Sequence, residues 1–171
     1  MLTTVLALVP LGAMLLPACA PTPADLVDLS VADGGTVYID TVCSTDCTGD
    51  TVSVAATFQE SVMVDIDASI QLLQYKVEYV LDGVDTPVTY FADTTDQTIS
   101  SGQTASFDIR MAAASQRALV SSLAGGQPVS GTATLTFAGY DWKDYVLTVE
   151  QQVPVVFDDY ADASTSDTGV M

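Results

Sequence analysis

The chain lacks histidine and asparagine, and only four of its 171 residues are lysine or arginine. Without histidine, a Ser-His-Asp triad, a Cys-His pair and the usual imidazole metal sites are excluded. The four basic residues lie far apart in the sequence against 22 acidic ones, and the net charge is −18. Phosphate recognition needs clustered Lys and Arg, so binding to nucleic acid is excluded, as is polybasic recognition of anionic lipid.

Other motifs are missing as well. Neither GxxxxGK[ST] nor GxGxxG occurs, so the common phosphate-binding loops are excluded. Beyond residue 19, no stretch is long and apolar enough to cross a membrane. What is abundant is aspartate, together with threonine, valine and tyrosine. Aspartate favours turns over helix interiors, and the other three favour strands, so this composition indicates an all-β protein with Asp-rich loops.

The first 19 residues, MLTTVLALVPLGAMLLPAC, are uncharged and dominated by Leu, Val, Ala and Met. The apolar run is too short to span a bilayer comfortably, and Pro10 and Gly12 interrupt it. It therefore predicts the apolar region of an export signal. One interpretation is a simple secretory signal that is cut at an A-x-A-like site near Ala20.

The other interpretation comes from the run Leu16-Pro17-Ala18-Cys19, which resembles the lipobox of bacterial lipoprotein signals. The resemblance implies that residues 1–18 are removed as a signal peptide and that Cys19 is acylated. Residues 19–25 would then be the lipidated cysteine and a Pro-rich spacer. Because Ala20 stands where an aspartate commonly signals inner-membrane retention, the resemblance implies an outer-membrane or cell-surface location.

From residue 26 to residue 158 the dominant pattern is an alternation of apolar and polar residues between turn clusters. The clearest strand is predicted at 73–83, and others at 24–31, 35–40, 50–60, 62–71, 87–92, 104–111, 131–141 and 144–157. The predicted buried face of the strand at 73–83 consists of Leu73, Tyr75, Val77, Tyr79 and Leu81. One Ala-rich segment predicts a short helix, Ala112 to Leu123, which ends at Gly125-Gly126.

Three stretches, QYKVEYVLDG, SSGQTASFDIRM and PVSGTATLTFAGYD, are similar to strands of the immunoglobulin-like, fibronectin-III-like domains of many bacterial lipoproteins. The resemblance implies an immunoglobulin-like antiparallel β-sandwich over 26–158, with one short crossover helix. Such domains mostly serve as structural, adhesive or binding modules, and the resemblance brings no catalytic residues. The remaining tail, 159–171, is acidic and rich in Ser and Thr, and we predict that it is disordered.

Cys43 and Cys47 lie in a short turn-rich segment, VCSTDCTGD. In an oxidising compartment we predict a structural disulfide, which would stabilise a local loop by roughly 2 kcal/mol at most. A redox dithiol normally has two residues between its cysteines, whereas this pair has three. A zinc site would need further Cys or His ligands.

Two binding hypotheses remain. Calcium prefers several oxygen ligands, which Asp-rich loops can supply, although a solvated acidic face would show the same pattern. The candidate calcium ligands are Asp65, Asp67, Asp82, Asp85, Asp93 and Asp96. Separately, Tyr140 and Trp142, the sole tryptophan, are expected at the tip of a hairpin. They could anchor a protein or sugar partner, or the ring of Trp142 could fold over the end of the core.

The sequence therefore predicts a lipid-anchored, non-enzymatic structural or adhesive module of the cell envelope. Its partners would be the membrane, through acyl chains on Cys19, and an envelope or extracellular protein or glycan. The alternative is a calcium-dependent protein- or carbohydrate-binding module. A remote alternative is an envelope glycosidase, although among 22 acidic residues a pair of carboxylates means little.

Overall fold

The computed structural model describes residues 22–31, 35–42, 51–61, 67–85 and 88–160, except for the side chains of 89–91. A 3-10 helix, η1 (Pro23–Leu26), precedes the strands, and one α-helix, α1 (Ala114–Leu123), lies between β6 and β7. The strands are β1 (Val27–Val31), β2 (Val37–Asp40), β3 (Thr51–Phe58), β4 (Ser69–Leu81), β5 (Val88–Ser100), β6 (Thr104–Arg110), β7 (Val129–Tyr140) and β8 (Val146–Asp158).

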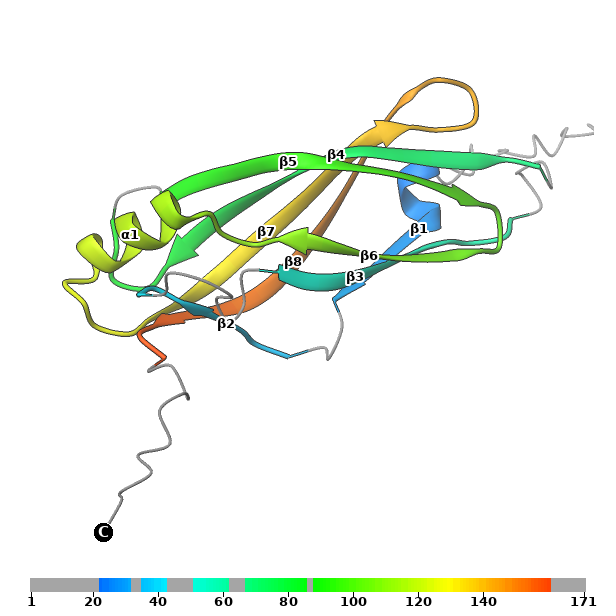
Figure 1. Ribbon diagram of the computed structural model, residues 1–171. Coiled ribbons are helices and arrows are strands. Elements are labelled where there is room, and N and C mark those ends of the chain that lie inside the picture. Colours follow the sequence, from blue (N-terminus) through cyan, green and yellow to red (C-terminus); the bar gives the residue numbers. More distant parts are fainter. Residues whose placement is uncertain (1–21, 32–34, 43–50, 62–66, 86–87, 161–171) are drawn as a thin grey trace, which may run out of the picture.

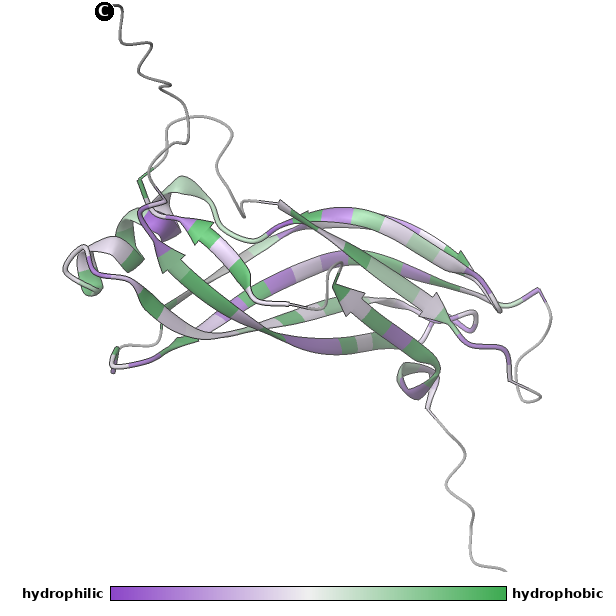
Figure 2. Ribbon diagram, turned by 90° about the horizontal axis from the view of Figure 1, so that it is seen from below, coloured by the Kyte–Doolittle hydropathy of each residue, from purple (hydrophilic) through white to green (hydrophobic). Residues whose placement is uncertain are grey.

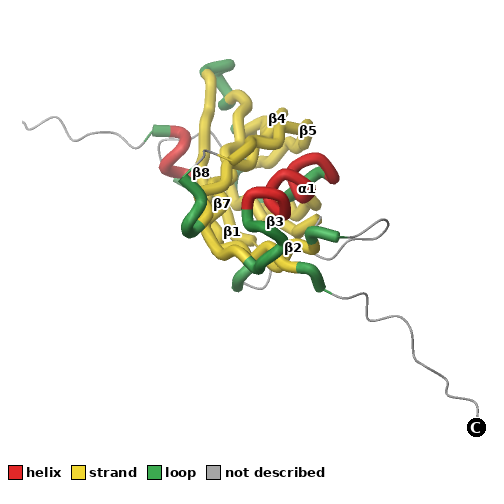
Figure 3. The backbone as a smooth tube through the Cα atoms, turned by 90° about the vertical axis from the view of Figure 1, so that its left-hand side faces the viewer, coloured by secondary structure: helices red, strands yellow, loops and turns green. Residues whose placement is uncertain are grey.

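The strands form two sheets (Figure 1). The small sheet has the order β1-β3-β6, and the large sheet has the order β2-β8-β7-β4-β5. Every pairing is antiparallel except that of β2 with β8. Viewed from one end, the large sheet is curled (Figure 3). The all-β class predicted from the alternation is confirmed, and so is the presence of one helix.

The strand β7 shows how the sequence pattern produces the core. Ala133, Leu135 and Phe137 are fully buried between the sheets, as their spacing predicts, while Thr132 and Thr134 lie on the opposite face. The same alternation of apolar and polar residues is visible along the strands in Figure 2. Burial of a side chain such as Phe137 contributes about 1.5–3 kcal/mol to stability.

Two tyrosines of β4 connect the large sheet to the end of β6. The Tyr75 hydroxyl accepts a hydrogen bond from the backbone N–H of Arg110 at 2.7 Å, and the Tyr79 hydroxyl donates to the carbonyl oxygen of Met111. The ring of Tyr79 also packs edge-on against Phe157, with 5.1 Å between ring centroids. Burial raises the pKa of the Tyr75 phenol above its usual value of 10.0.

The prediction that Leu73 lies on the buried face of its strand was wrong. A register shift between Leu72 and Gln74 forms a β-bulge, which places Ile70 and Leu72 inward before it and Tyr75 inward after it. Leu73 instead lines a hollow together with Tyr140 and Val146. A single extra residue in a strand reverses which side chains face the core, and simple alternation cannot detect this.

Several element boundaries also differ from the prediction. The strand predicted at 87–92 is β5, which continues to Ser100, because β4 supplies hydrogen-bond partners along its polar second half. The helix begins at Ala114, two residues later than predicted. In place of two strands at 62–71 and 73–83 there is one continuous strand, β4, and residues 62–66 lie outside the described residues.

The two-sheet structure has two distinct ends (Figure 1). The tip end comprises η1, the start of β4, the β5–β6 turn and the β7–β8 hairpin. The helix end comprises α1, the turn that begins at Asp82, β2 and the last residues of β8. At the helix end α1 contacts both β8 and β5, and it buries Val120 completely.

Candidate functional site

The β7–β8 hairpin closes in a five-residue loop whose geometry depends on Asp141. The last strand pair joins Tyr140 to Val146. The carboxylate of Asp141 accepts hydrogen bonds from the backbone N–H groups of Lys143 at 2.8 Å and Tyr145 at 2.9 Å. Asp144 has a left-handed φ of 62°, and its N–H donates to the Asp141 carbonyl. The buried Asp141 side chain thus supplies hydrogen-bond acceptors to backbone N–H groups that the sharp turn leaves without partners in the neighbouring strand.

Trp142 lies over the end of the core rather than extending into solvent. Its ring stacks on that of Phe58, with 5.7 Å between centroids and an interplanar angle of 28°. It is half-buried and packs against the core residues. The ammonium group of Lys143 lies 5.8 Å from the centroid of the Trp142 ring. Of the two outcomes considered for Trp142, the structure shows the ring folded over the core.

Three other residues of the hairpin present apolar surface to solvent. Tyr140 is 43% exposed, Tyr145 is 68% exposed and Val146 is 77% exposed. We call these three residues the tip patch. Tyr140 was singled out from the sequence, but Tyr145 and Val146 were not. For Val146 the signal was present in the alternation, because Leu147 and Val149 are buried and residues of even number in β8 face outward, whereas Tyr145 lies in the loop before β8.

The five candidate calcium ligands in the described part of the chain are not brought together. Asp65 lies outside the described residues, and Asp67 precedes β4 at the tip end. Asp82 and Asp85 lie at the helix end, whereas Asp93 and Asp96 lie within β5. Those in the described part of the chain are all exposed. Within that part, no three His, Cys, Asp or Glu side chains are grouped so that they could hold a metal ion.

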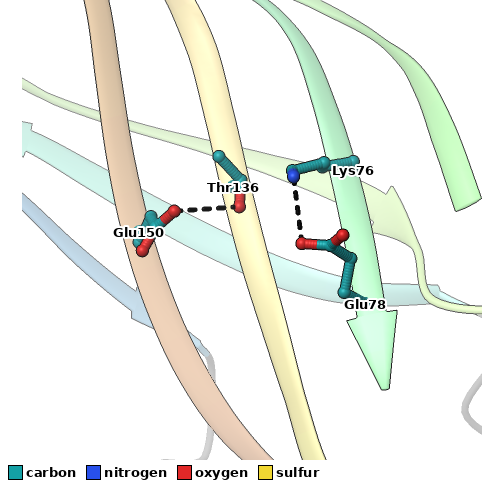
Figure 4. Close-up of polar contacts among 4 residues, drawn as sticks. All are labelled: Lys76, Glu78, Thr136 and Glu150. Carbon is teal, nitrogen blue, oxygen red and sulfur yellow. Dashed lines mark hydrogen bonds and ion pairs between the residues drawn. The ribbon is translucent and has the colours of Figure 1, made fainter. Parts of the chain in front are cut away.

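The outer face of the large sheet carries a hollow of about 540 Å³ between β5, β4, β7 and β8. Figure 4 shows its polar contacts: Lys76 forms an ion pair with Glu78 at 2.9 Å, and Thr136 donates a hydrogen bond to Glu150 at 3.4 Å. Lys76 and Glu78 are both largely exposed, so this ion pair contributes little to stability. Glu150 is the one acidic residue that lines the hollow.

The cysteine predictions lie outside the described residues. This applies to the lipidation site Cys19 and to the predicted disulfide between Cys43 and Cys47. The predicted disordered tail is described only at Asp159 and Tyr160, and the Tyr160 ring packs edge-on against Tyr38. In the part of the chain that the structure describes, no helix combines the length and apolar character needed to cross a membrane.

No protein-family model and no curated protein matches the chain. A crystal structure of a protein from Archaeoglobus fulgidus is similar at a TM-score of 0.41 and 15% identity, over 75% of this chain and 92% of that one. The solution structure of a protein assigned to the late embryogenesis abundant (LEA) class is similar at a TM-score of 0.41 and 16% identity. That similarity covers 80% of this chain and 74% of the LEA protein. Neither similarity is high enough to bear on function.

Proposed function

We propose that the protein is a lipid-anchored, non-enzymatic module of the cell envelope with a structural or adhesive role. The observation that carries the proposal is the position of Cys19. The lipobox-like run ends at Cys19, and the first described element, η1, begins at Pro23, only four residues later. A cysteine so close to the start of the folded domain is well placed to serve as an anchor. Two or three acyl chains, at about 0.8 kcal/mol per buried methylene, hold a protein firmly where one chain does not.

The strand order supports the finer proposal of an immunoglobulin-like sandwich. Immunoglobulin domains place strands A, B and E in one sheet and G, F and C in the other. The small sheet β1-β3-β6 corresponds to A-B-E, and the run β8-β7-β4 corresponds to G-F-C. The helix α1 lies in the connection between β6 and β7, which are the counterparts of E and F. Domains of this architecture serve many roles, so the module is proposed by analogy of fold.

Two observations support a role without catalysis. The chain has no histidine to act as a general base. A glycosidase needs two carboxylates on opposite sides of a cleft, whereas the outer-face hollow is lined by one, that of Glu150. The partner in this proposal is an envelope or extracellular protein or glycan, and the location is an outer membrane or cell surface.

The test is metabolic labelling of the full chain with an alkyne-bearing fatty acid, followed by separation of membranes from soluble protein. We expect the label and the protein together in the membrane fraction. The variant Cys19→Ser should lose both, because no thiol remains for acylation. The double variant Cys43→Ser, Cys47→Ser is the matched control and should keep both. An unlabelled wild-type chain that behaves like Cys19→Ser would contradict the proposal.

A further inference from the structure

The folded domain begins at the same end as the β7–β8 hairpin. The carbonyl oxygen of Leu26, in η1, accepts a hydrogen bond from the backbone N–H of Gln59 at 2.8 Å. The preceding residue, Phe58, stacks on Trp142 in the hairpin loop. The helix η1 also contacts β8 directly. Figure 1 shows η1 and the hairpin at one end of the two-sheet structure, with α1 at the other.

The length of chain between Cys19 and Pro23 limits how far an anchored domain can move from the bilayer. Four residues, even when fully extended, span at most about 14 Å. The 12-residue strand β7 alone is about 40 Å long at 3.3 Å per residue. An acylated Cys19, which is the function proposed above, therefore holds the tip end next to the membrane surface. The helix end then lies far from the membrane surface when the strands are oriented away from the bilayer.

The side chains exposed at the tip end suit the interfacial region of a bilayer. Tyrosine has an apolar ring and a polar hydroxyl, and it is enriched where membrane proteins cross the headgroup level. The tip patch supplies Tyr140 and Tyr145, with Val146 as the most exposed apolar side chain of the described residues. Beside them stands Lys143, one of only four basic residues in the chain, whose long stem can extend its ammonium group toward headgroup phosphates.

The charge of the chain determines the kind of surface that fits. At −18 the protein as a whole is repelled by an anionic membrane, so the contact must be apolar and short-ranged. Three side chains bury too little apolar area to bind a soluble domain to lipid. Attachment through Cys19 removes that difficulty, because it raises the local concentration of the patch at the surface.

From the shared end, the short spacer and the exposed aromatic residues, we propose that the tip patch rests in the headgroup region of the membrane to which Cys19 anchors the chain. The tip patch thus orients the domain, so that α1 and the helix end project away from the bilayer. This inference rests on the proposed lipid anchor and adds the face that contacts lipid.

The experiment uses the full lipidated chain reconstituted in phosphatidylcholine vesicles that contain a lipid with a nitroxide quencher in its headgroup region. In a Trp142→Phe background, Tyr145→Trp reports on the tip end and Leu123→Trp, on an exposed residue of α1, reports on the helix end. We expect quenching of Tyr145→Trp to be several-fold stronger than that of Leu123→Trp. Equal quenching, or stronger quenching at Leu123→Trp, would overturn the orientation.

A second pair of variants keeps the native tryptophan, in case Trp142→Phe disturbs the fold. In the lipidated wild type, the emission of Trp142 should shift to shorter wavelength when vesicles are added. The variant Tyr145→Ser, Val146→Ser should lose this shift and still float with the vesicles, whereas Leu119→Ser, Leu123→Ser should keep it. A shift that survives in the tip variant would overturn the inference. A wild-type chain that does not float at all would overturn the anchor itself, and with it the proposed function.

Discussion

The two ends of the two-sheet structure are closed in different ways. At the helix end the ten-residue helix α1 covers the opening between β8 and β5, and its own residue Val120 is fully buried there. At the tip end the cover is a five-residue loop, which is held by Trp142 on Phe58 and by the hydrogen bonds of Asp141. The loop uses one aromatic ring for the core and leaves Tyr145 exposed beside it. The comparison shows how one hairpin can complete a core and still present a surface for contact.

The largest expected effect comes from removing the ring beneath Trp142. Phe58→Ala should lower the free energy of unfolding by about 3–5 kcal/mol, because the Phe58 side chain is fully buried. At the helix end, Val120→Ala should cost about 2 kcal/mol, from two methyl groups at roughly 0.8 kcal/mol each.

Urea unfolding measures both values, and Trp142 fluorescence distinguishes the ends. In the folded state the emission should shift to longer wavelength in Phe58→Ala only, because only that variant uncovers one face of the indole. If Val120→Ala shifts the emission as much as Phe58→Ala does, the two ends are not independently closed.

The next effect is that of the aspartate that holds the loop. Asp141→Ala removes two hydrogen bonds from backbone N–H groups to a carboxylate, and it should cost about 1–3 kcal/mol. Asp144→Gly is the matched control, since it removes the same charge from the same loop. Glycine adopts the left-handed conformation of residue 144 readily, so this variant should not be destabilised. A thermal melt in which the two variants lose equal stability would indicate a charge effect instead.

A smaller effect is expected at the exposed apolar residues of the two ends. In the absence of membranes, Tyr145→Ser at the tip end and Leu119→Ser on α1 should each change the free energy of unfolding by no more than about 0.5 kcal/mol. Urea unfolding of the Cys19→Ser chain, which cannot be acylated at position 19, provides the measurement. A loss of several times that size in Tyr145→Ser would mean that the ring packs on the protein and is not free to contact lipid.

The smallest expected effect is that of calcium, whose candidate ligands are distributed over both ends and β5. A site occupied at a hundred times its dissociation constant would stabilise the fold by about 2.7 kcal/mol and raise the melting temperature by several degrees. Because Asp67, Asp82 and Asp93 lie on separate parts of the fold, we expect no difference between calcium, magnesium and EDTA. A rise of several degrees with calcium alone would restore the calcium-dependent alternative.

The central strands could be predicted from the sequence because each buries one face. Ala133, Leu135 and Phe137 alternate with threonines, and that pattern favours a strand with one apolar face, although Thr136 is buried as well. The bulge at Leu73 and the polar half of β5 could not be predicted, since both depend on pairing with strands distant in sequence. The same limit applies to Trp142, whose position depends on Phe58, 84 residues earlier in the chain.

The site was predicted only in part. Tyr140 and Trp142 were recognised from the hairpin pattern, whereas Tyr145 was not. Which of these rings faces solvent depends on the loop that Asp141 closes. The parallel pairing of β2 with β8 is likewise a long-range feature, and Pro154 directly precedes the four residues of β8 that take part in it.

The lipid anchor at Cys19 is tested most directly by intact-mass and peptide mass spectrometry of the chain recovered from membranes. We predict a mature protein whose first residue is Cys19, with a diacylglycerol on the thiol and a further acyl chain on the new amine. A mature chain that begins at or near Ala20, or one that retains Cys19 without lipid, would contradict both the anchor and the orientation that rests on it.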